Sequence, residues 1–96
     1  MIFFDWDENK NKINIQKHGV SFKEAASAFN DDNSLEKADP DHSDEEERFI
    51  YMGLSNKGNI LVIVFCYKGD EDHIRIISAR KANKLEQITY FTWGIL

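Results

Sequence analysis

Two arginines near the end of the sequence have the chemistry of a phosphate-binding site. Arg75 interrupts an apolar run, where burial of an unpaired guanidinium would be costly, and Arg80 follows just past the same segment. A guanidinium presents parallel N–H donors to phosphate oxygens, so two of them at neighbouring strand exits would form a fork for a phosphate group. The alternative for Arg75 is structural, an ion pair across a sheet with Glu47 or another acid.

A histidine and a lysine form a second candidate site. His18 follows Lys17 and stands directly before Gly19, where a helix is expected to end. The negative end of a helix dipole favours a protonated imidazole, so His18 is a candidate general acid or base. The alternative is that His18 only caps the helix.

An acidic loop is the candidate for a metal site. Asp39, Asp41, His42 and Asp44 are close in sequence, and oxygen-rich loops can hold divalent ions. Their spacing lacks the mid-loop glycine and the terminal acid of a calcium loop, so we expect neither a metal nor another cofactor. Cys66 ends the most apolar run of the chain and is expected to fill the core rather than act as a nucleophile.

The first third of the chain predicts a strand followed by two helices. Asp7 is suited to cap the first helix and Gly19 to end it. Ser21 is suited to cap the second, and Glu24 three residues later completes a capping-box pattern. The expected elements are a strand at residues 2–7 and helices at 8–17 and 22–30.

The remaining sequence predicts a loop, three strands and a helix. Residues 31–46 are rich in acids and hold the only proline, which indicates an exposed loop with a brief extended piece near Leu35. Residues 60–66 are apolar on both faces, as in a central strand. The expected elements are strands at 48–54, 60–67 and 73–78 and a helix at 79–90. In the last strand, Ile74 and Ile76 should share one face and His73, Arg75 and Ile77 the other.

This element order predicts an α+β fold. The order is β-α-α-β-β-β-α, with an antiparallel sheet packed against helices. At 96 residues, with no repeat and no linker, we expect a single domain over residues 1–96. A lone cysteine excludes an internal disulfide, and the longest apolar run of seven residues is too short for a membrane span. We therefore expect a small soluble protein of the cytoplasm.

The charge is unevenly distributed. The chain has 17 acidic and 12 basic side chains, and residues 31–48 alone hold nine of the acids against two bases. Residues 73–96 hold four bases against one acid. Such asymmetry could place a cationic cleft beside an acidic flap, or offer an acidic surface to a basic partner. The alternative is that the acidic segment is only a solvated loop.

Several segments together resemble the BrnT toxin family. The match runs from residue 3 to about residue 90, with the motifs in the family's order and spacing. The Lys17-His18-Gly19 segment and the Arg75–Arg80 segment carry most of its specificity. The segments that match are residues 4–7, 14–22, 24–26, 41–43, 46–49, 53 and 74–82.

The resemblance implies a ribonuclease toxin of a type II toxin–antitoxin system with a RelE-like fold. It also implies a BrnA antitoxin that carries a DNA-binding domain, holds the toxin inactive in a complex of two toxins and two antitoxins, and represses the shared operon. The apolar residues at the end of the chain are candidates for the antitoxin contact or for packing on the sheet. These residues are Phe91, Trp93, Ile95 and Leu96.

Metal-independent RNA cleavage needs a base for the 2′-hydroxyl proton, an acid for the leaving oxygen and cations around the phosphate. Arg75 and Arg80 are suited to bind the phosphate. His18 or Glu47 could transfer the protons. Glu47 and Arg48 alternate along one strand, so only one of them can share the face of Arg75, and we expect it to be Glu47. Lys17, Lys81 and Lys84 are expected to hold the RNA backbone.

Two other functions remain open at this point. The acidic net charge of −5 favours a non-catalytic binding module that acts as a co-repressor with its antitoxin. A metal-dependent hydrolase built on the loop at residues 39–44 would need a divalent ion and would lose its activity in chelator.

Overall fold

A computed structural model describes residues 1–39 and 47–93. The chain forms a five-stranded sheet in the order β1-β5-β4-β3-β2, in which β1 runs parallel to β5 and the other neighbours are antiparallel. The elements are β1 (Phe3–Asp5), α1 (Glu8–His18), α2 (Phe22–Ser27), the 3-10 turn η1 (Ala28–Asn30), β2 (Leu35–Ala38), β3 (Arg48–Leu54), β4 (Ile60–Lys68), β5 (Asp70–Lys81) and α3 (Lys84–Trp93).

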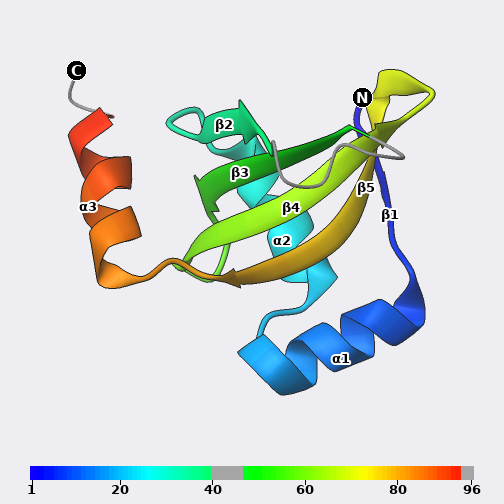
Figure 1. Cartoon of the computed structure of the whole chain (residues 1–96), viewed down its shortest axis with the longest axis horizontal. Helices are drawn as coiled ribbons and strands as arrows, with labels where there is room; N and C mark the ends of the chain where they lie inside the picture. The colour runs from blue at the N-terminus through cyan, green and yellow to red at the C-terminus, as the bar shows by residue number, and fades with distance from the viewer. Residues whose placement is uncertain (40–46, 94–96) are drawn as a thin grey trace.

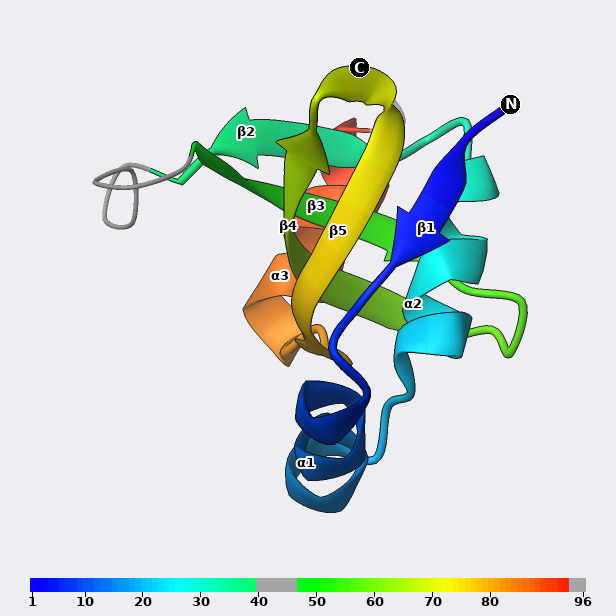
Figure 2. The ribbon, with the colours of Figure 1, turned by 90° about the vertical axis from the view of Figure 1, so that its right-hand side faces the viewer.

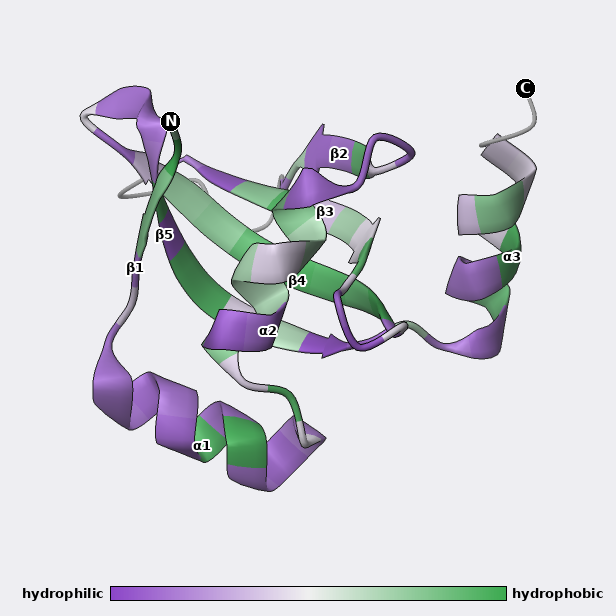
Figure 3. Cartoon of the chain, turned by 180° about the vertical axis from the view of Figure 1, so that it is seen from behind, coloured by the Kyte–Doolittle hydropathy of each residue, from purple (hydrophilic) through white to green (hydrophobic). Residues whose placement is uncertain are grey.

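The helices lie on different sides of the sheet. Seen from behind, α2 lies across one face of the sheet, while α1 lies below the end of β5 (Figure 3). The last helix, α3, stands on the other side of the sheet from α2 (Figures 1 and 2). The α+β class is therefore confirmed. Within the described ranges, no helix has the length and apolar character needed to cross a membrane.

The helix ends follow the predicted capping residues. The Asp7 carboxylate accepts hydrogen bonds from the backbone N–H groups of Asn9 and Lys10, and Gly19 ends α1 in the left-handed region at φ 70°. The Ser21 hydroxyl accepts from the Glu24 N–H, which caps α2. These are the start and stop signals that the sequence carries.

The predicted role of Glu24 in a capping box at the start of α2 is wrong. The Glu24 carboxylate is buried and accepts hydrogen bonds from the Ser55 hydroxyl (2.7 Å) and the Asn59 side-chain amide (2.9 Å) in the β3–β4 turn. A buried carboxylate needs several donors, and the turn offers two where the helix start offers one. Glu24 therefore ties α2 to the hairpin.

The core lies between α2 and the sheet face that α2 covers. Leu61, Ile63 and Phe65 of β4 are fully buried there, as the doubly apolar run predicts, and Cys66 is buried on the opposite face. Phe29 stacks on Tyr51 with ring centroids 4.2 Å apart, and its edge meets Phe65. These contacts connect η1 to the two central strands.

The extended piece predicted near Leu35 is confirmed: it is the strand β2, paired along β3 from Leu35–Met52 to Ala38–Phe49. Two other features of the sheet differ from the predictions. The first strand lies parallel to β5, so the sheet is mixed. The segment 79–81, expected in the last helix, continues β5 because Arg80 and Lys81 pair with Val62 and Leu61. Sheet pairing with a buried neighbour outweighs the helix propensity of this short segment.

Asn14 of α1 fixes the end of β5. Its buried side-chain amide donates to the carbonyls of Val20 (2.8 Å) and Ala79 (2.7 Å), and its oxygen accepts from the Ala79 N–H (3.2 Å). One side chain therefore joins α1, the α1–α2 corner and β5.

Replacing Asn14 by alanine is expected to lower the free energy of unfolding by about 3 kcal/mol, because it leaves buried backbone groups without partners. Urea unfolding followed by circular dichroism measures the change. Asn9→Ala, on the exposed side of the same helix, is the matched control and should shift the free energy by less than about 0.5 kcal/mol. Equal transitions for the two variants would show that the Asn14 bonds contribute nothing.

Candidate active site

An unpaired residue in β5 brings the two candidate arginines to one face of the sheet. Ser78 pairs with Val64 and Ile76 with Phe65, so Ile77 has no partner and forms a bulge. Residues five apart in a regular strand point to opposite faces, but one extra residue restores the same face. Arg75 and Arg80 therefore both lie on the face opposite α2, here called the open face.

Cross-strand rows define the open face. Arg48 of β3, Cys66 of β4 and Arg75 of β5 are register partners in one row. Met52, Val62 and Arg80 are register partners in a second row. The expected separation of Ile74 and Ile76 from His73, Arg75 and Ile77 is confirmed, since both isoleucines are buried on the core face and the other three residues are only half-buried.

Arg75 is held by a carboxylate from the edge strand. Its Nη1 donates to Oδ1 of Asp5 (3.1 Å), and the other carboxylate oxygen of Asp5 lies 3.0 Å from Nε2 of His73. Asp5 sits opposite Arg75 in the parallel β1–β5 pair, so its side chain is on the open face as well. The acid that pairs with Arg75 is therefore Asp5 and not Glu47.

Arg80 is held by a carboxylate from α3. Nη1 and Nη2 of Arg80 donate to the two oxygens of Glu86 at 2.7 and 2.8 Å. This bidentate pair raises the pKa of Arg80 and lowers the pKa of Glu86 below its usual 4.5. Glu86 also accepts from the Asn83 N–H while Asn83 accepts from the Glu86 N–H, which makes a capping box at the start of α3.

The expected single fork of two guanidiniums is wrong. Arg75 and Arg80 share a face, but their register partners Cys66 and Val62 are four residues apart on β4, which separates the two arginine positions by about 13 Å. Each guanidinium is engaged by a different carboxylate. The open face therefore presents two separate cationic positions along β5.

The expected orientation of Glu47 is also wrong. Glu47 is exposed and precedes β3, whereas Arg48 is the residue opposite Cys66 in the row that contains Arg75. Because side chains alternate along a strand, Arg48 and not Glu47 shares the open face.

His18 lies at the Arg80 end of β5. It follows Asn14 by one turn of α1, and Asn14 contacts Ala79. Two residues four apart lie on the same side of a helix, so His18 is on the side of α1 that meets β5. The imidazole is exposed and has no hydrogen-bond partner within residues 1–39 and 47–93. Lys17, Lys81 and Lys84 are exposed around the same end of the strand.

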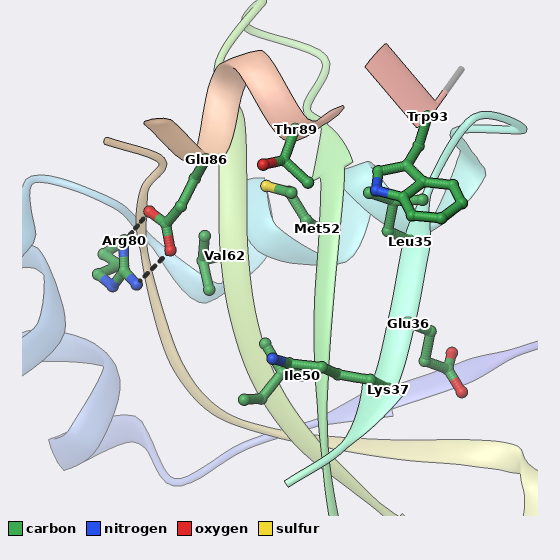
Figure 4. Close-up of a pocket in the computed structure, with 10 residues that line it drawn as sticks. All are labelled: Leu35, Glu36, Lys37, Ile50, Met52, Val62, Arg80, Glu86, Thr89 and Trp93. Atoms are coloured by element: carbon green, nitrogen blue, oxygen red, sulfur yellow. Dashed lines mark hydrogen bonds and ion pairs between the residues drawn. The ribbon is translucent and has the colours of Figure 1, made fainter. Parts of the chain in front are cut away.

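A pocket of about 570 Å³ lies between α3 and the open face. Trp93 and Leu35 lie together at one side of it, and the Arg80–Glu86 pair lies at the other (Figure 4). Its other lining residues are Glu36, Lys37, Ile50, Met52, Val62 and Thr89. The pocket is therefore largely apolar, with an ion pair at its rim.

A second contact anchors α3. The Tyr90 hydroxyl donates to the carboxylate of Asp31, which also accepts from the Leu54 N–H at 2.8 Å. Burial and the neighbouring Asp31 raise the pKa of Tyr90 to about 12. Burial alone would raise the pKa of Asp31, but the hydrogen bonds from Tyr90, Leu54 and Asn33 together lower it.

Of the candidate metal ligands in the acidic loop, only Asp39 belongs to the described residues. Asp39 is buried, and Asp41, His42 and Asp44 lie outside the described residues. Among the residues that are described, no three His, Cys, Asp or Glu side chains are grouped as metal ligands would be.

Sequence reasoning missed three residues of this site: Asp5, His73 and Glu86. Glu86 had a usable signal, because Asn83 and Glu86 have the spacing of a capping box and place the helix start after β5. The partnership of Asp5 with His73 and Arg75 had none, since it depends on a parallel pairing of strands almost 70 residues apart.

Lowering the pH is expected to remove the contribution of the Arg80–Glu86 pair to stability. The pKa of Glu86 is lowered on folding, so the contribution is present at neutral pH and is lost as the pH falls through the folded pKa, below 4.5. Between pH 7 and about pH 3, wild type should lose more free energy of unfolding than Glu86→Gln, by about 1 kcal/mol or less. Glu71→Gln, at an exposed position in β5, should follow the wild type; parallel curves for all three would contradict the pairing.

Comparisons with known proteins agree with this architecture. The family model described as "Ribonuclease toxin, BrnT, of type II toxin-antitoxin system" matches residues 6–86. The 1.1 Å crystal structure of the Brucella abortus ribonuclease toxin BrnT is similar, with a TM-score of 0.58 and 28% sequence identity over 88% of this chain and 100% of that chain. A comparison with curated proteins finds no match.

Proposed function

Since this chain belongs to the BrnT family of ribonuclease toxins from type II toxin–antitoxin systems, we propose that it is a metal-independent endoribonuclease whose cleavage of RNA blocks translation. The observation that carries this proposal is the placement of Arg75 and Arg80 on one accessible face, each oriented by a carboxylate. The compartment we propose is the cytoplasm, where the RNA substrate is found.

The reaction proposed is an internal transfer at phosphorus. A base takes the proton of the ribose 2′-hydroxyl, and the 2′-oxygen forms a bond to the adjacent phosphorus. The bond from phosphorus to the 5′-oxygen breaks, and that oxygen takes a proton. The products are a 2′,3′-cyclic phosphate and a 5′-hydroxyl, and no metal or oxidant is consumed.

The arginines suit the charge that develops on the phosphate. The carboxylates of Asp5 and Glu86 accept hydrogen bonds from Arg75 and Arg80 and so orient both guanidiniums before substrate arrives. Groups that are already oriented stabilise a transition state without reorganising. His18 and Glu47 are the candidates for proton transfer that follow from the sequence, and of these His18 lies on the side of α1 that meets the Arg80 end of β5.

The overall acidity of the protein is compatible with RNA binding at this face. Lys17, Lys81 and Lys84 are exposed around the end of β5 and are proposed to bind the RNA backbone. Nine of the seventeen acids lie in residues 31–48, so the three lysines belong to segments of the sequence that hold fewer acids. Binding that uses few phosphate contacts should depend on salt with a small slope.

A type II family implies an antitoxin partner. We propose a BrnA-like antitoxin with a DNA-binding domain, in a complex of two toxins and two antitoxins. Phe91 and Trp93 on α3 are 59% and 60% exposed, as expected for apolar residues that contact a partner protein. Ile95 and Leu96, the other two candidates, lie outside the described residues.

The net charge of −5 favours one alternative, a protein that binds its antitoxin and co-represses without cleaving RNA. A metal-dependent hydrolase at the 39–44 loop is the other, and full activity in chelator would exclude it.

Inducible expression in a bacterial host tests the proposed activity. Wild type is expected to arrest growth with loss of total RNA, while Arg75→Ala and Arg80→Ala should lose at least about 100-fold of the cleavage rate and let cells grow. Lys57→Ala removes the same charge from the β3–β4 turn and should remain toxic. Growth arrest by all variants would keep the toxin function but place the active site elsewhere, with His18 as the next candidate. No arrest by soluble wild type would favour the non-catalytic co-repressor.

The proposed antitoxin contact is tested by measuring binding of the partner to variants of exposed helix residues. Phe91→Ser should raise the Kd for the antitoxin at least about tenfold, because an anchoring aromatic side chain is lost. Ile13→Ser changes an equally exposed apolar residue of α1 and serves as the matched control. An unchanged Kd for Phe91→Ser would place the contact elsewhere.

A further inference from the structure

We propose that His73 is the proton-transfer residue of the RNA cleavage, oriented by Asp5 and placed beside Arg75 on the open face. This inference rests on the proposed ribonuclease activity and replaces His18 and Glu47 in that role. It is carried by the arrangement of Asp5, His73 and Arg75, which comes from the pairing of β1 with β5.

One carboxylate connects the imidazole to the guanidinium. Oδ2 of Asp5 lies 3.0 Å from Nε2 of His73, and Oδ1 accepts from Nη1 of Arg75 at 3.1 Å. With both oxygens of Asp5 occupied, neither the ring nor the guanidinium can turn away without losing a charge-assisted hydrogen bond. The arrangement is therefore one unit rather than three independent surface residues.

The bond to Asp5 also selects the nitrogen that can react. In neutral His73 the proton sits on Nε2, which donates to Asp5, so the lone pair of Nδ1 is left as the acceptor. A carboxylate that holds an imidazole in one tautomer is how a catalytic histidine is prepared to accept a proton. His18 has no such partner within the described ranges, and Glu47 does not lie on the open face.

The strand geometry places the base and the phosphate-binding group at a useful spacing. His73 and Arg75 are two residues apart on one strand, so they share a face with Cα atoms about 7 Å apart. Their long side chains can reach one phosphate and its neighbouring 2′-hydroxyl together. Arg75 is paired with β1 on one side and with β4 on the other, and His73 is paired with Phe3 of β1, which limits their movement.

The unit is open to a polymer substrate. The side chains of His73, Asp5 and Arg75 are 40%, 42% and 37% exposed. These three groups therefore lie beside each other where solvent reaches them. An extended RNA strand can therefore contact them without a rearrangement of the fold.

In the proposed step, Nδ1 of neutral His73 takes the proton of the 2′-hydroxyl. The 2′-oxygen bonds to phosphorus while the bond from phosphorus to the 5′-oxygen breaks, and the 5′-oxygen takes a proton from solvent water. His73 returns its proton to solvent after the products leave. Arg75 donates to the phosphate oxygens, and Asp5 acts as a positioning residue because it stabilises the imidazolium that forms.

The test uses the purified chain of 96 residues and a short fluorogenic RNA. Wild type is expected to cleave it, and His73→Gly should lower kcat about 100-fold or more. Added imidazole should restore part of the loss in His73→Gly, because the free base can occupy the vacated space next to Asp5. Asp5→Asn should lower kcat with little change in KM, and Asp5→Glu should recover much of it.

Asp72→Asn, which neutralises an exposed acid adjacent to His73 in sequence, is the control for charge and should cleave like wild type. No cleavage by wild type would reject the proposed ribonuclease itself. Cleavage by wild type and His73→Gly alike would leave the ribonuclease and overturn the role of His73. A loss that imidazole does not restore, in a variant with the wild-type unfolding transition, would also overturn it.

Discussion

The unpaired residue Ile77 in β5 is the constraint on which the open face depends. With regular pairing, Arg75 and Arg80 would point to opposite sides of the sheet, and one of them would have to enter the core beneath α2. The bulge lets Ile74, Ile76 and Ala79 face the core while both arginines face outward. Asn14 holds Ala79 directly beyond the bulge, so a polar bond from α1 keeps the shifted register in place.

Different elements position the two groups of charged residues on the open face. The group with Asp5, His73 and Arg75 is built from two paired strands, so its geometry follows from the sheet alone. The group with Arg80 depends on α3, because Glu86 belongs to that helix. Backbone pairing fixes the residues of a site that lies on paired strands. The position of Arg80, in contrast, depends on how firmly α3 packs against the sheet.

The sequence predicts those structural features that depend on residues close to one another in the chain. Asp7, Gly19 and Ser21 mark helix ends through bonds to residues within a few positions, and these ends are confirmed. The alternation of Ile74 and Ile76 is also local. The pairing of Asp5 with Arg75, the bulge at Ile77 and the bonds of Glu24 to the β3–β4 turn join distant segments, so no pattern in a short window contains them.

Glu86 shows how one side chain couples local and distant structure. It completes a capping box with Asn83, which a sequence pattern can reveal, and it accepts from the two terminal nitrogens of Arg80, which the pattern cannot reveal. Because the same carboxylate starts α3 and orients Arg80, the position of the helix and the direction of the arginine cannot vary independently. The bond from Tyr90 to Asp31 fixes a second point of α3, one turn further along. Two points define the line of a short helix, so together these contacts set where α3 crosses the pocket and where Arg80 meets its rim.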